Sequence, residues 1–164
     1  MTLRELNKEN AHELLQMQLQ LDNETTNMMY EPGERPNDIT RLHTLIENNA
    51  NNGSVVYLAY EDETCVGFLS AMRGGFNKIR HTAYIAVGIL RDYRGKGIGN
   101  ALFNQLIEWA DSNGIKRLDL SVMTHNQAGI ALYKKHGFVI EGTKKCAMFV
   151  KGTFIDEHFM ARVT

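Results

Sequence analysis

Apolar side chains recur along the chain with two different spacings, and these spacings predict which segments are helical and which are extended. From Gly97 to Ser112, apolar residues return every three or four positions, at Ile98, Leu102, Leu106 and Trp109. Because this is the period of a helix with one buried face, the segment predicts the clearest helix of the chain.

Several other apolar segments are typical of strands. Val55–Tyr60 and Cys65–Met72 flank the polar residues Glu61–Thr64, which predicts a hairpin. His81–Leu90 is strongly apolar, as a buried strand is, and residues 118–122 alternate between apolar and polar side chains. These last two segments lie on either side of the clearest helix, so a strand, a helix and a strand follow one another.

Weaker signals of the same kind predict the remaining elements. We expect strands at Thr2–Leu6, from Phe138 to Glu141 and onward, and at about Phe154–Ala161. We expect helices around Ala11–Leu21, from Asn37 or Asp38 to Gly53, and at Ala128–His136. The order is then β-α-α-β-β-β-α-β-α-β-β. This order and the length of 164 residues predict one domain of the α/β or α+β class, with a mixed sheet and helices on its faces.

Composition excludes several classes of protein. Apolar residues make up 43% of the chain, too many for a disordered protein, and the net charge of −1 argues against nucleic-acid binding. No apolar run approaches the roughly 20 residues that cross a bilayer. The polar N-terminal segment does not resemble a signal peptide. Cys65 and Cys146 form no disulfide framework, so we expect both to be reduced in a cytoplasmic protein.

The small net charge hides an uneven distribution. Residues 1–64 carry 4 basic and 12 acidic side chains, whereas residues 65–164 carry 14 basic and 7 acidic ones. Such asymmetry is typical of two differently charged surfaces, although a chance spread of solvated side chains gives the same counts. No two histidines have metal-ligand spacing and neither cysteine has a partner nearby, so we expect no metal.

A glycine-rich turn separates the apolar strand from the clearest helix. It contains Gly95, Gly97 and Gly99 together with the cations Arg94 and Lys96. Glycines let a ligand approach the backbone closely, and the free N–H groups and dipole of a helix start attract anions. The turn therefore predicts a phosphate or pyrophosphate site, and the alternative is a tight structural turn.

Two common phosphate-binding motifs do not match this turn. In a P-loop, Leu90 would be glycine and Gly97 would be serine or threonine, so the hydroxyl that holds magnesium is missing. In the dinucleotide motif, Asn100 stands where the third glycine belongs, and Asp119 lies inside a predicted strand rather than at its carboxyl end. A nicotinamide-dependent oxidoreductase stays as an outside alternative.

Two segments resemble the motifs of a known family. Residues 94–99, Arg-Gly-Lys-Gly-Ile-Gly, have the form R/Q-x-x-G-x-G/A and resemble the acetyl-coenzyme A signature of the GNAT N-acetyltransferases. Residues 126–138 resemble that superfamily's motif N-x-x-A/G-I-x-L-Y-x-K-x-G-F. Residues 141–144 and 152–162 are similar to its ribosomal-protein-acetyltransferase-like branch.

The resemblance implies a fold, an activity and a cosubstrate. It implies a single GNAT domain over residues 1–164, with about six to seven strands and four helices. Residues 1–53 would supply the front strand and acceptor-side helices, and residues 54–164 the coenzyme-binding core. Acetyl would pass from acetyl-coenzyme A to a primary amine of a small molecule or a protein N-terminus, by direct attack and without metal. The alternative is a module that binds acetyl-coenzyme A without turnover. Homodimers are common in the family.

The resemblance also assigns roles around the turn. The backbone of Val87, Gly88 and Ile89 would pair with the pantetheine arm, and one of their N–H groups would polarise the thioester carbonyl. Gly88 would be a bulge that separates this strand from its neighbour. The N–H groups of residues 95–99, including that of Ile98, would bind the pyrophosphate.

Three residues of the second motif receive roles in the same way. Asn126 is either a helix N-cap or a contact to the pantetheine or thioester, and the two are compatible. Tyr133 would protonate the departing thiolate as a general acid; the alternative is a buried aromatic anchor. Lys135 would contact the coenzyme's phosphates.

The family's general base has no counterpart here. Its usual positions correspond to Ala83 or Ile85 and to Ser121, none of which accepts a proton at neutral pH. His81 and His125 are the nearest candidates that titrate near neutral pH, unless a water chain delivers a neutral amine.

The acidic first third suggests a preference for the acceptor. In the family, the segment corresponding to residues 30–38 helps to wall the acceptor site. We therefore expect Glu31 and Glu34 to favour a cationic amine.

Overall fold

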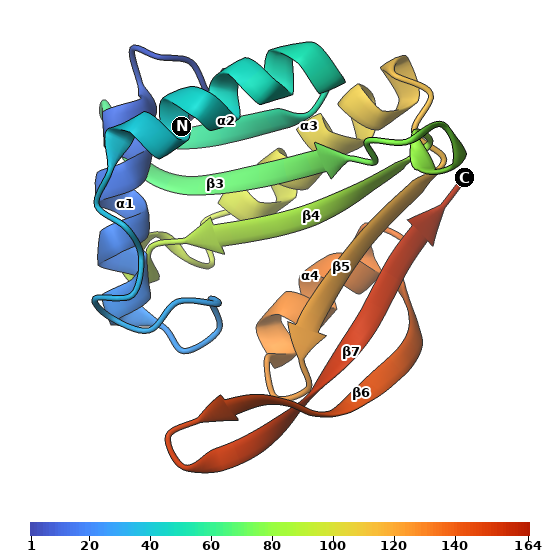
Figure 1. The fold of residues 1–164 in the computed structure, drawn as a ribbon. Coiled ribbons are helices and arrows are strands. Elements are labelled where there is room, and N and C mark those ends of the chain that lie inside the picture. The colour runs from blue at the N-terminus through green and yellow to red at the C-terminus, as the bar shows by residue number, and fades with distance from the viewer.

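The computed structural model describes all 164 residues and contains one seven-stranded sheet, in the order β1-β2-β3-β4-β5-β7-β6 (Figure 1). The strands are β1 (Thr2–Glu5), β2 (Val55–Glu61), β3 (Thr64–Arg73), β4 (Thr82–Ile89), β5 (Arg117–Met123), β6 (Val139–Val150) and β7 (Thr153–Val163). The helices are α1 (Ala11–Glu24), α2 (Ile39–Asn52), α3 (Ile98–Ser112) and α4 (Gln127–Lys135). The predicted order of elements and the mixed single-domain fold are confirmed.

Helices cover the sheet on both faces. Side chains of α3 and α4 share one apolar cluster with β4 residues such as Ala83 and Ile85. Side chains of α1 form part of a second cluster, against which side chains of α2 pack. Ala86 of β4 also packs against this second cluster, so it lies on the other face of β4 from Ala83 and Ile85. Successive strand residues point to opposite faces, so the near-continuous apolar character of β4 follows from burial on both sides.

Local chemistry sets the helix ends. The Asp38 side chain accepts a hydrogen bond from the Thr40 N–H at 3.0 Å, so Asp38 rather than Asn37 is the N-cap of α2. Gly53 ends this helix with φ of 78°, a left-handed conformation that glycine adopts without strain. No helix combines the length and the apolar character that crossing a bilayer requires.

The sheet divides between β4 and β5, its one parallel pair. These strands are paired at only three positions, Thr82 with Arg117, Ala83 with Leu118 and Tyr84 with Asp119. Beyond them the strands diverge, as Figure 1 shows, while β5 stays paired with β7 along its whole length. We call the space between residues 85–89 and 120–123 the strand gap.

Gly88 does not form the expected bulge. The pairing of β3 with β4 runs without a register shift, and Gly88 lies opposite Phe68. A side chain at position 88 would collide with Leu21 of α1, and its Cβ would lie 2.9 Å from Phe68 Cε1. The glycine is therefore needed for the close approach of α1 to β4, and the divergence from β5 already begins after Tyr84.

Candidate functional site

The strand gap exposes backbone groups of β4 that no strand pairs. The Leu90 N–H donates to the Val66 carbonyl at 2.9 Å, which places residue 90 at a hydrogen-bonded position of the ladder with β3. Antiparallel pairs alternate, so Ile85, Val87 and Ile89 direct their N–H and C=O groups away from β3 and into the gap. Of the three residues expected to meet a pantetheine arm, Val87 and Ile89 have the correct backbone direction, and the Gly88 amide bonds β3.

The glycine turn closes one end of this gap. Gly95 and Gly97 have φ of 73° and 87°, and a Cβ on either would meet nothing within 4 Å. Their surroundings are thus open toward solvent, and the first N–H groups of α3 have no partner within the helix. Arg94 Nε donates to the Ile89 carbonyl at 3.0 Å, which holds a guanidinium beside the turn. The Lys96 ammonium lies 5.1 Å from the centroid of the Tyr93 ring.

A cleft of about 450 Å³, here named the turn cleft, joins the turn to the strand gap. Its lining includes eight of the residues predicted to bind coenzyme, namely Val87, Gly88, Ile89, Arg94, Gly95, Gly97, Gly99 and Asn126. Four others do not line it, of which Tyr133 lines an adjoining cavity described below. The Ile98 side chain is buried in the core, and the side chains of Lys96 and Lys135 are exposed outside the cleft.

Asn126 begins α4 and also faces the cleft. Its side-chain carbonyl accepts the Gly129 N–H at 3.0 Å, so the predicted N-cap is confirmed. A Cβ at position 129 would lie 2.8 Å from Asn126 Nδ2, so this cap needs glycine there. The capping bond fixes the amide at the mouth of the strand gap.

Tyr133 is anchored in the core, as one reading of the motif predicted. It is 8% exposed, and its ring packs against Phe103 with centroids 5.5 Å apart. Burial raises the pKa of Tyr133 to about 12, so the phenol stays protonated at neutral pH. Tyr133 also lines a second cavity, so the aromatic anchor belongs to the wall of the site.

This second cavity, of about 210 Å³, is here named the gap cavity, because residues of β4 and β5 form most of its wall. Asn27, Met28, Val87 and Asn126 line both it and the turn cleft, so the two spaces adjoin. The remaining wall residues are Met29, Tyr84, Ile85, Ala86, Leu120, Ser121, Val122, Met123, Tyr133, Met148 and Glu157.

A third space, the outer pocket of about 470 Å³, adjoins the gap cavity and also shares Thr25 and Met28 with the turn cleft. The end of α1, residues 25–32 and the β6–β7 hairpin line it, and it shares Met28, Met29, Met123 and Met148 with the gap cavity. Turn cleft, gap cavity and outer pocket therefore form one groove that passes between two strands of the sheet.

Glu31 lines the outer pocket, but Glu34 does not. A Glu34 carboxylate oxygen accepts the Glu31 N–H at 2.8 Å, so this side chain stabilises the loop. Asp22 also lines the pocket, yet it forms a buried ion pair with Arg35 at 2.6 Å. Lys151 is a further cation of the pocket. Most acidic side chains of residues 1–64 near this pocket are therefore engaged in hydrogen bonds or ion pairs. The prediction of a cationic acceptor then depends on Glu31 alone.

Glu24 connects α1 to the segment before the glycine turn. Its carboxylate accepts the Arg91 N–H at 2.8 Å, and its backbone carbonyl accepts from the Arg91 guanidinium. The hydrogen bond from the Arg91 backbone holds the pKa of Glu24 below its ordinary value. This contact fixes the edge of the outer pocket to the end of β4.

Neither histidine proposed as a base is brought to the groove. His81 precedes β4, whereas the glycine turn follows it, so the length of the strand separates them. His125 lies just before α4, but its side chain is exposed and lines none of the three spaces. Proximity to a motif along the sequence therefore does not bring either side chain to the groove.

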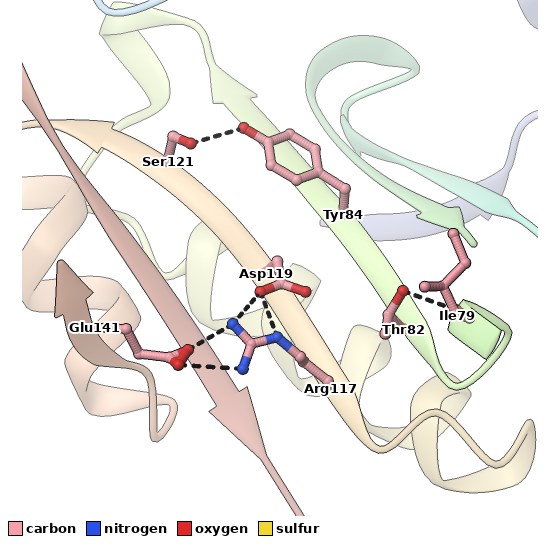
Figure 2. A network of polar contacts seen from close by, with 7 residues as sticks. All are labelled: Ile79, Thr82, Tyr84, Arg117, Asp119, Ser121 and Glu141. Carbon is pink, nitrogen blue, oxygen red and sulfur yellow. Dashed lines mark hydrogen bonds and ion pairs between the residues drawn. The ribbon is translucent and has the colours of Figure 1, made fainter. Parts of the chain in front are cut away.

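Sequence reasoning missed Tyr84 and Glu157 in the wall of the gap cavity. The Tyr84 hydroxyl donates to the Ser121 hydroxyl at 3.1 Å, across the point where β4 and β5 separate (Figure 2). Glu157 reaches the cavity because β7 pairs it with Met123 of β5. The motifs carry no signal for either residue, since only the register of β5 and β7 brings Glu157 near.

The same face carries an arginine held by two carboxylates. Arg117 donates to Asp119 at 2.7 Å and also binds Glu141 (Figure 2). Asp119 is therefore engaged in the paired part of β5, inside the strand as the sequence predicted, which again argues against a nicotinamide coenzyme. No group of histidine, cysteine, aspartate or glutamate residues is arranged to hold a metal ion.

Comparison with known proteins agrees with this geometry. The model of the acetyltransferase (GNAT) family matches residues 14–138. An L-amino acid N-acetyltransferase of Escherichia coli (strain K12) is 34% identical over 84 residues, which are 51% of this chain and 52% of that protein. The chain spans about half the length of the first curated relatives that it matches.

Solved structures match over nearly the whole chain. A GNAT-family acetyltransferase from Streptococcus pneumoniae superposes with a TM-score of 0.94 and 28% identity, covering 99% of this chain and 98% of that one. A ribosomal-protein-alanine N-acetyltransferase from Brucella melitensis superposes with a TM-score of 0.88 and 27% identity, covering 100% of both.

Proposed function

The chain belongs to the GNAT family of acetyltransferases, and from this premise we propose that it transfers the acetyl group of acetyl-coenzyme A to a primary amine within a ternary complex. The observation that carries the proposal is the strand gap, which leaves β4 backbone groups unpaired beside an open glycine turn. The residues present fit acetyl-coenzyme A, which supplies an activated thioester at one end of a long arm and phosphates at the other.

Each part of the turn cleft suits a different part of that molecule. The N–H groups of residues 95–99 and the Arg94 guanidinium suit the pyrophosphate, because a helix start attracts anions. The open φ > 0 positions Gly95 and Gly97 leave space for it. The Val87 N–H and C=O and the Ile89 N–H suit the amides of the pantetheine arm, which would add to the sheet as a strand does, whereas the Ile89 carbonyl already accepts from Arg94.

Two groups of the chain would assist the transfer. An N–H of the unpaired β4 edge, at Val87 or Ile89, would donate to the thioester oxygen and stabilise negative charge that develops there. The protonated Tyr133 hydroxyl lines the gap cavity and would donate its proton to the departing sulfur.

The acceptor would enter through the outer pocket, which adjoins the gap cavity. The acceptor we propose is a small molecule or a protein N-terminus that offers a primary amine. Relatives named for acetylation of L-amino acids and of a ribosomal-protein alanine support this class. The unpaired Glu31 in the pocket supports a cationic amine.

The second candidate function is a module that binds acetyl-coenzyme A without turnover. The absence of both proposed histidines from the groove favours it. The deciding experiment measures release of coenzyme A thiol with a panel of amino acids, polyamines, peptides and aminoglycosides, together with calorimetric binding of acetyl-coenzyme A. Thiol release with any amine supports acetyl transfer, whereas tight binding without thiol release supports the module.

Two further expectations concern the setting of the reaction. We propose that the protein is a homodimer, and that it is cytoplasmic, a setting in which unpaired cysteines are usual. Light scattering coupled to size-exclusion chromatography measures the assembly state, and a monomeric mass would contradict the dimer.

A further inference from the structure

The wall of the gap cavity contains three titratable side chains, Tyr84, Tyr133 and Glu157. An amine that is protonated in water must lose a proton before its nitrogen can attack a thioester. Of the three groups, only the Glu157 side chain is a carboxylate, whose oxygens can accept a proton from an amine or a water molecule.

The sheet register places Glu157 beside Ser121. Glu157 lies opposite Met123, and Phe159 lies opposite Ser121, in an unshifted antiparallel pairing of β5 with β7. Side chains of directly paired residues share a face, as do residues two apart on one strand. Glu157 and Ser121 are therefore diagonal neighbours on one face, a distance that a polar side chain and one water molecule can span.

Glu157 is half-buried and free to accept a proton. Its carboxylate makes no ion pair and no hydrogen bond to another side chain, unlike Glu141 and Asp156, which bind Arg117 and Lys145. The charged residue nearest in register is Lys144 of β6, which is directly paired with Glu157 across the two strands but forms no ion pair with it. From the other elements, only Tyr84 of β4 and Tyr133 of α4 present titratable groups to the cavity.

The Tyr84–Ser121 hydrogen bond gives this cluster a direction. Tyr84 donates to the Ser121 oxygen, so the Ser121 hydroxyl proton is free to point toward the cavity. A water bound by that proton can donate to Glu157 and accept from an incoming ammonium. In this series of hydrogen bonds, each group donates to the next one, and the Glu157 carboxylate is the final acceptor.

We propose that Glu157 is the general base of the acetyl transfer, with Ser121 and Tyr84 as positioning residues for the water between it and the acceptor. The inference rests on the proposed function. The ammonium gives one proton through the water to Glu157, and its nitrogen then bonds to the acetyl carbon as the carbon–sulfur bond breaks. Tyr133 gives its proton to sulfur and regains one from the nitrogen. The products are an amide, the thiol of coenzyme A and one proton that Glu157 passes to solvent.

The test compares Glu157→Gln with the unaltered protein, using the best amine from the panel and hydroxylamine, an amine already neutral at pH 7. With the protonated amine at pH 7, the variant should lose kcat/KM by about 10²-fold or more, and the loss should shrink as the pH rises. With hydroxylamine the loss should be small, and the affinity for acetyl-coenzyme A measured by calorimetry should stay unchanged. Ser121→Ala and Tyr84→Phe should show the same dependence on the amine with a smaller loss.

A second readout does not depend on turnover. In ¹³C-NMR spectra of the protein bound to coenzyme A, the Glu157 carboxyl resonance is assigned by its loss in Glu157→Gln. We expect it to shift when the acceptor amine is added. Glu141→Gln is the matched control, since it removes a carboxylate from the same half of the sheet that is tied to Arg117 and lines none of the three spaces. It should keep the rates of the unaltered protein.

The failure of this inference can be told apart from failure of the proposed function. An unaltered pH profile in Glu157→Gln, or an equal loss with hydroxylamine and the protonated amine, overturns the role of Glu157 and leaves acetyl transfer standing. A protein that does not raise thiol release above the rate without protein for any amine, hydroxylamine included, overturns both.

Discussion

Tyr133 shows how a single residue can serve the core and the site together. Its ring packs against Phe103 and Phe138, while its hydroxyl side reaches the gap cavity. The two readings of this tyrosine that the sequence left open are therefore compatible in space. The ring explains why an aromatic residue is needed, and only the hydroxyl is available for chemistry.

Tyr133→Phe separates the two contributions. Because the ring is kept, folding and the Kd for acetyl-coenzyme A should change little. Turnover should fall by about tenfold or more, because the donor to the departing sulfur is lost. Steady-state thiol release and calorimetry measure the two effects, and unchanged turnover would show that the hydroxyl has no part in the transfer.

Gly97 is the residue that most directly tests the position of the phosphates. Gly97→Val should weaken acetyl-coenzyme A binding by about tenfold or more, which corresponds to about 1.4 kcal/mol, because the branched side chain projects into the open space at the helix start. Valine is also strained at φ of 87°.

Gly114→Val is the matched control for that strain. Gly114 follows the opposite end of α3 and has φ of 68°, and a Cβ at this position would likewise meet nothing within 4 Å. We expect a similar loss of thermal stability and no loss of coenzyme affinity. If both variants bind acetyl-coenzyme A with equal affinity, the pyrophosphate does not bind at this turn.

At the scale of elements, α1 reaches the strand gap only because β4 has no side chain at Gly88. Leu21 of α1 and Phe68 of β3 occupy the space that a Cβ would need. The helix in turn carries Glu24, whose contact with Arg91 joins α1 to the segment before the glycine turn. The first third of the chain is thus fixed to β4 and to the segment that follows it at two points.

Gly88→Ala should destabilise the protein by about 1–3 kcal/mol through overpacking. Adding Leu21→Ala should recover part of the loss, since it removes the colliding methyl groups, although Leu21→Ala alone opens a cavity and destabilises. Urea unfolding of the four proteins gives the coupling free energy. Additive effects would mean that α1 does not press on β4 at this position.

The hydrophobic pattern predicted the elements well because most of them bury at least one face. Asp38 and Gly53 mark the ends of α2 as their local chemistry requires. Strand partners and register were not readable in the same way, since they depend on contacts between distant segments. Glu157 is the clearest case, because its place in the gap cavity follows only from its pairing with Met123. The glycine turn was predictable as a turn that leads into a helix because its residues form one continuous segment.

At the scale of the whole molecule, four groups make stability depend on pH in the same direction. Hydrogen bonds lower the pKa values of Glu24, Glu141 and Asp156, from the Arg91 backbone, the Arg117 side chain and the Cys146 backbone respectively. Burial, with smaller effects of Lys135 and Arg162, lowers the pKa of His136. Each group binds protons more readily in the unfolded chain than in the folded one.

Stability should therefore fall as the pH falls. The His136 contribution is lost first, below its ordinary pKa of 6.5, and the carboxylate contributions follow below about 4.5. Melting temperatures measured from pH 8 to pH 3.5 should decrease, and His136→Gln should flatten the curve between pH 6.5 and 5. A melting temperature that rises on acidification would contradict the signs of these shifts.

The interrupted pairing of β4 with β5 has a consequence for the edges of the sheet. A seven-stranded sheet ordinarily has two edges, here β1 and β6. The strand gap adds two internal ones, and an unpaired edge is a template on which foreign strands can grow. An occupant with its own amides, such as a pantetheine arm, would close these edges as well as react there.

Hydrogen–deuterium exchange should then slow at the amides of Val87 and Ile89 when acetyl-coenzyme A is added, and change less at Ala86 and Gly88, which β3 already protects. Protection that does not alternate would mean that the arm does not pair with the strand. The gap that would admit the substrate is thus also where this sheet is most open to pairing with another chain.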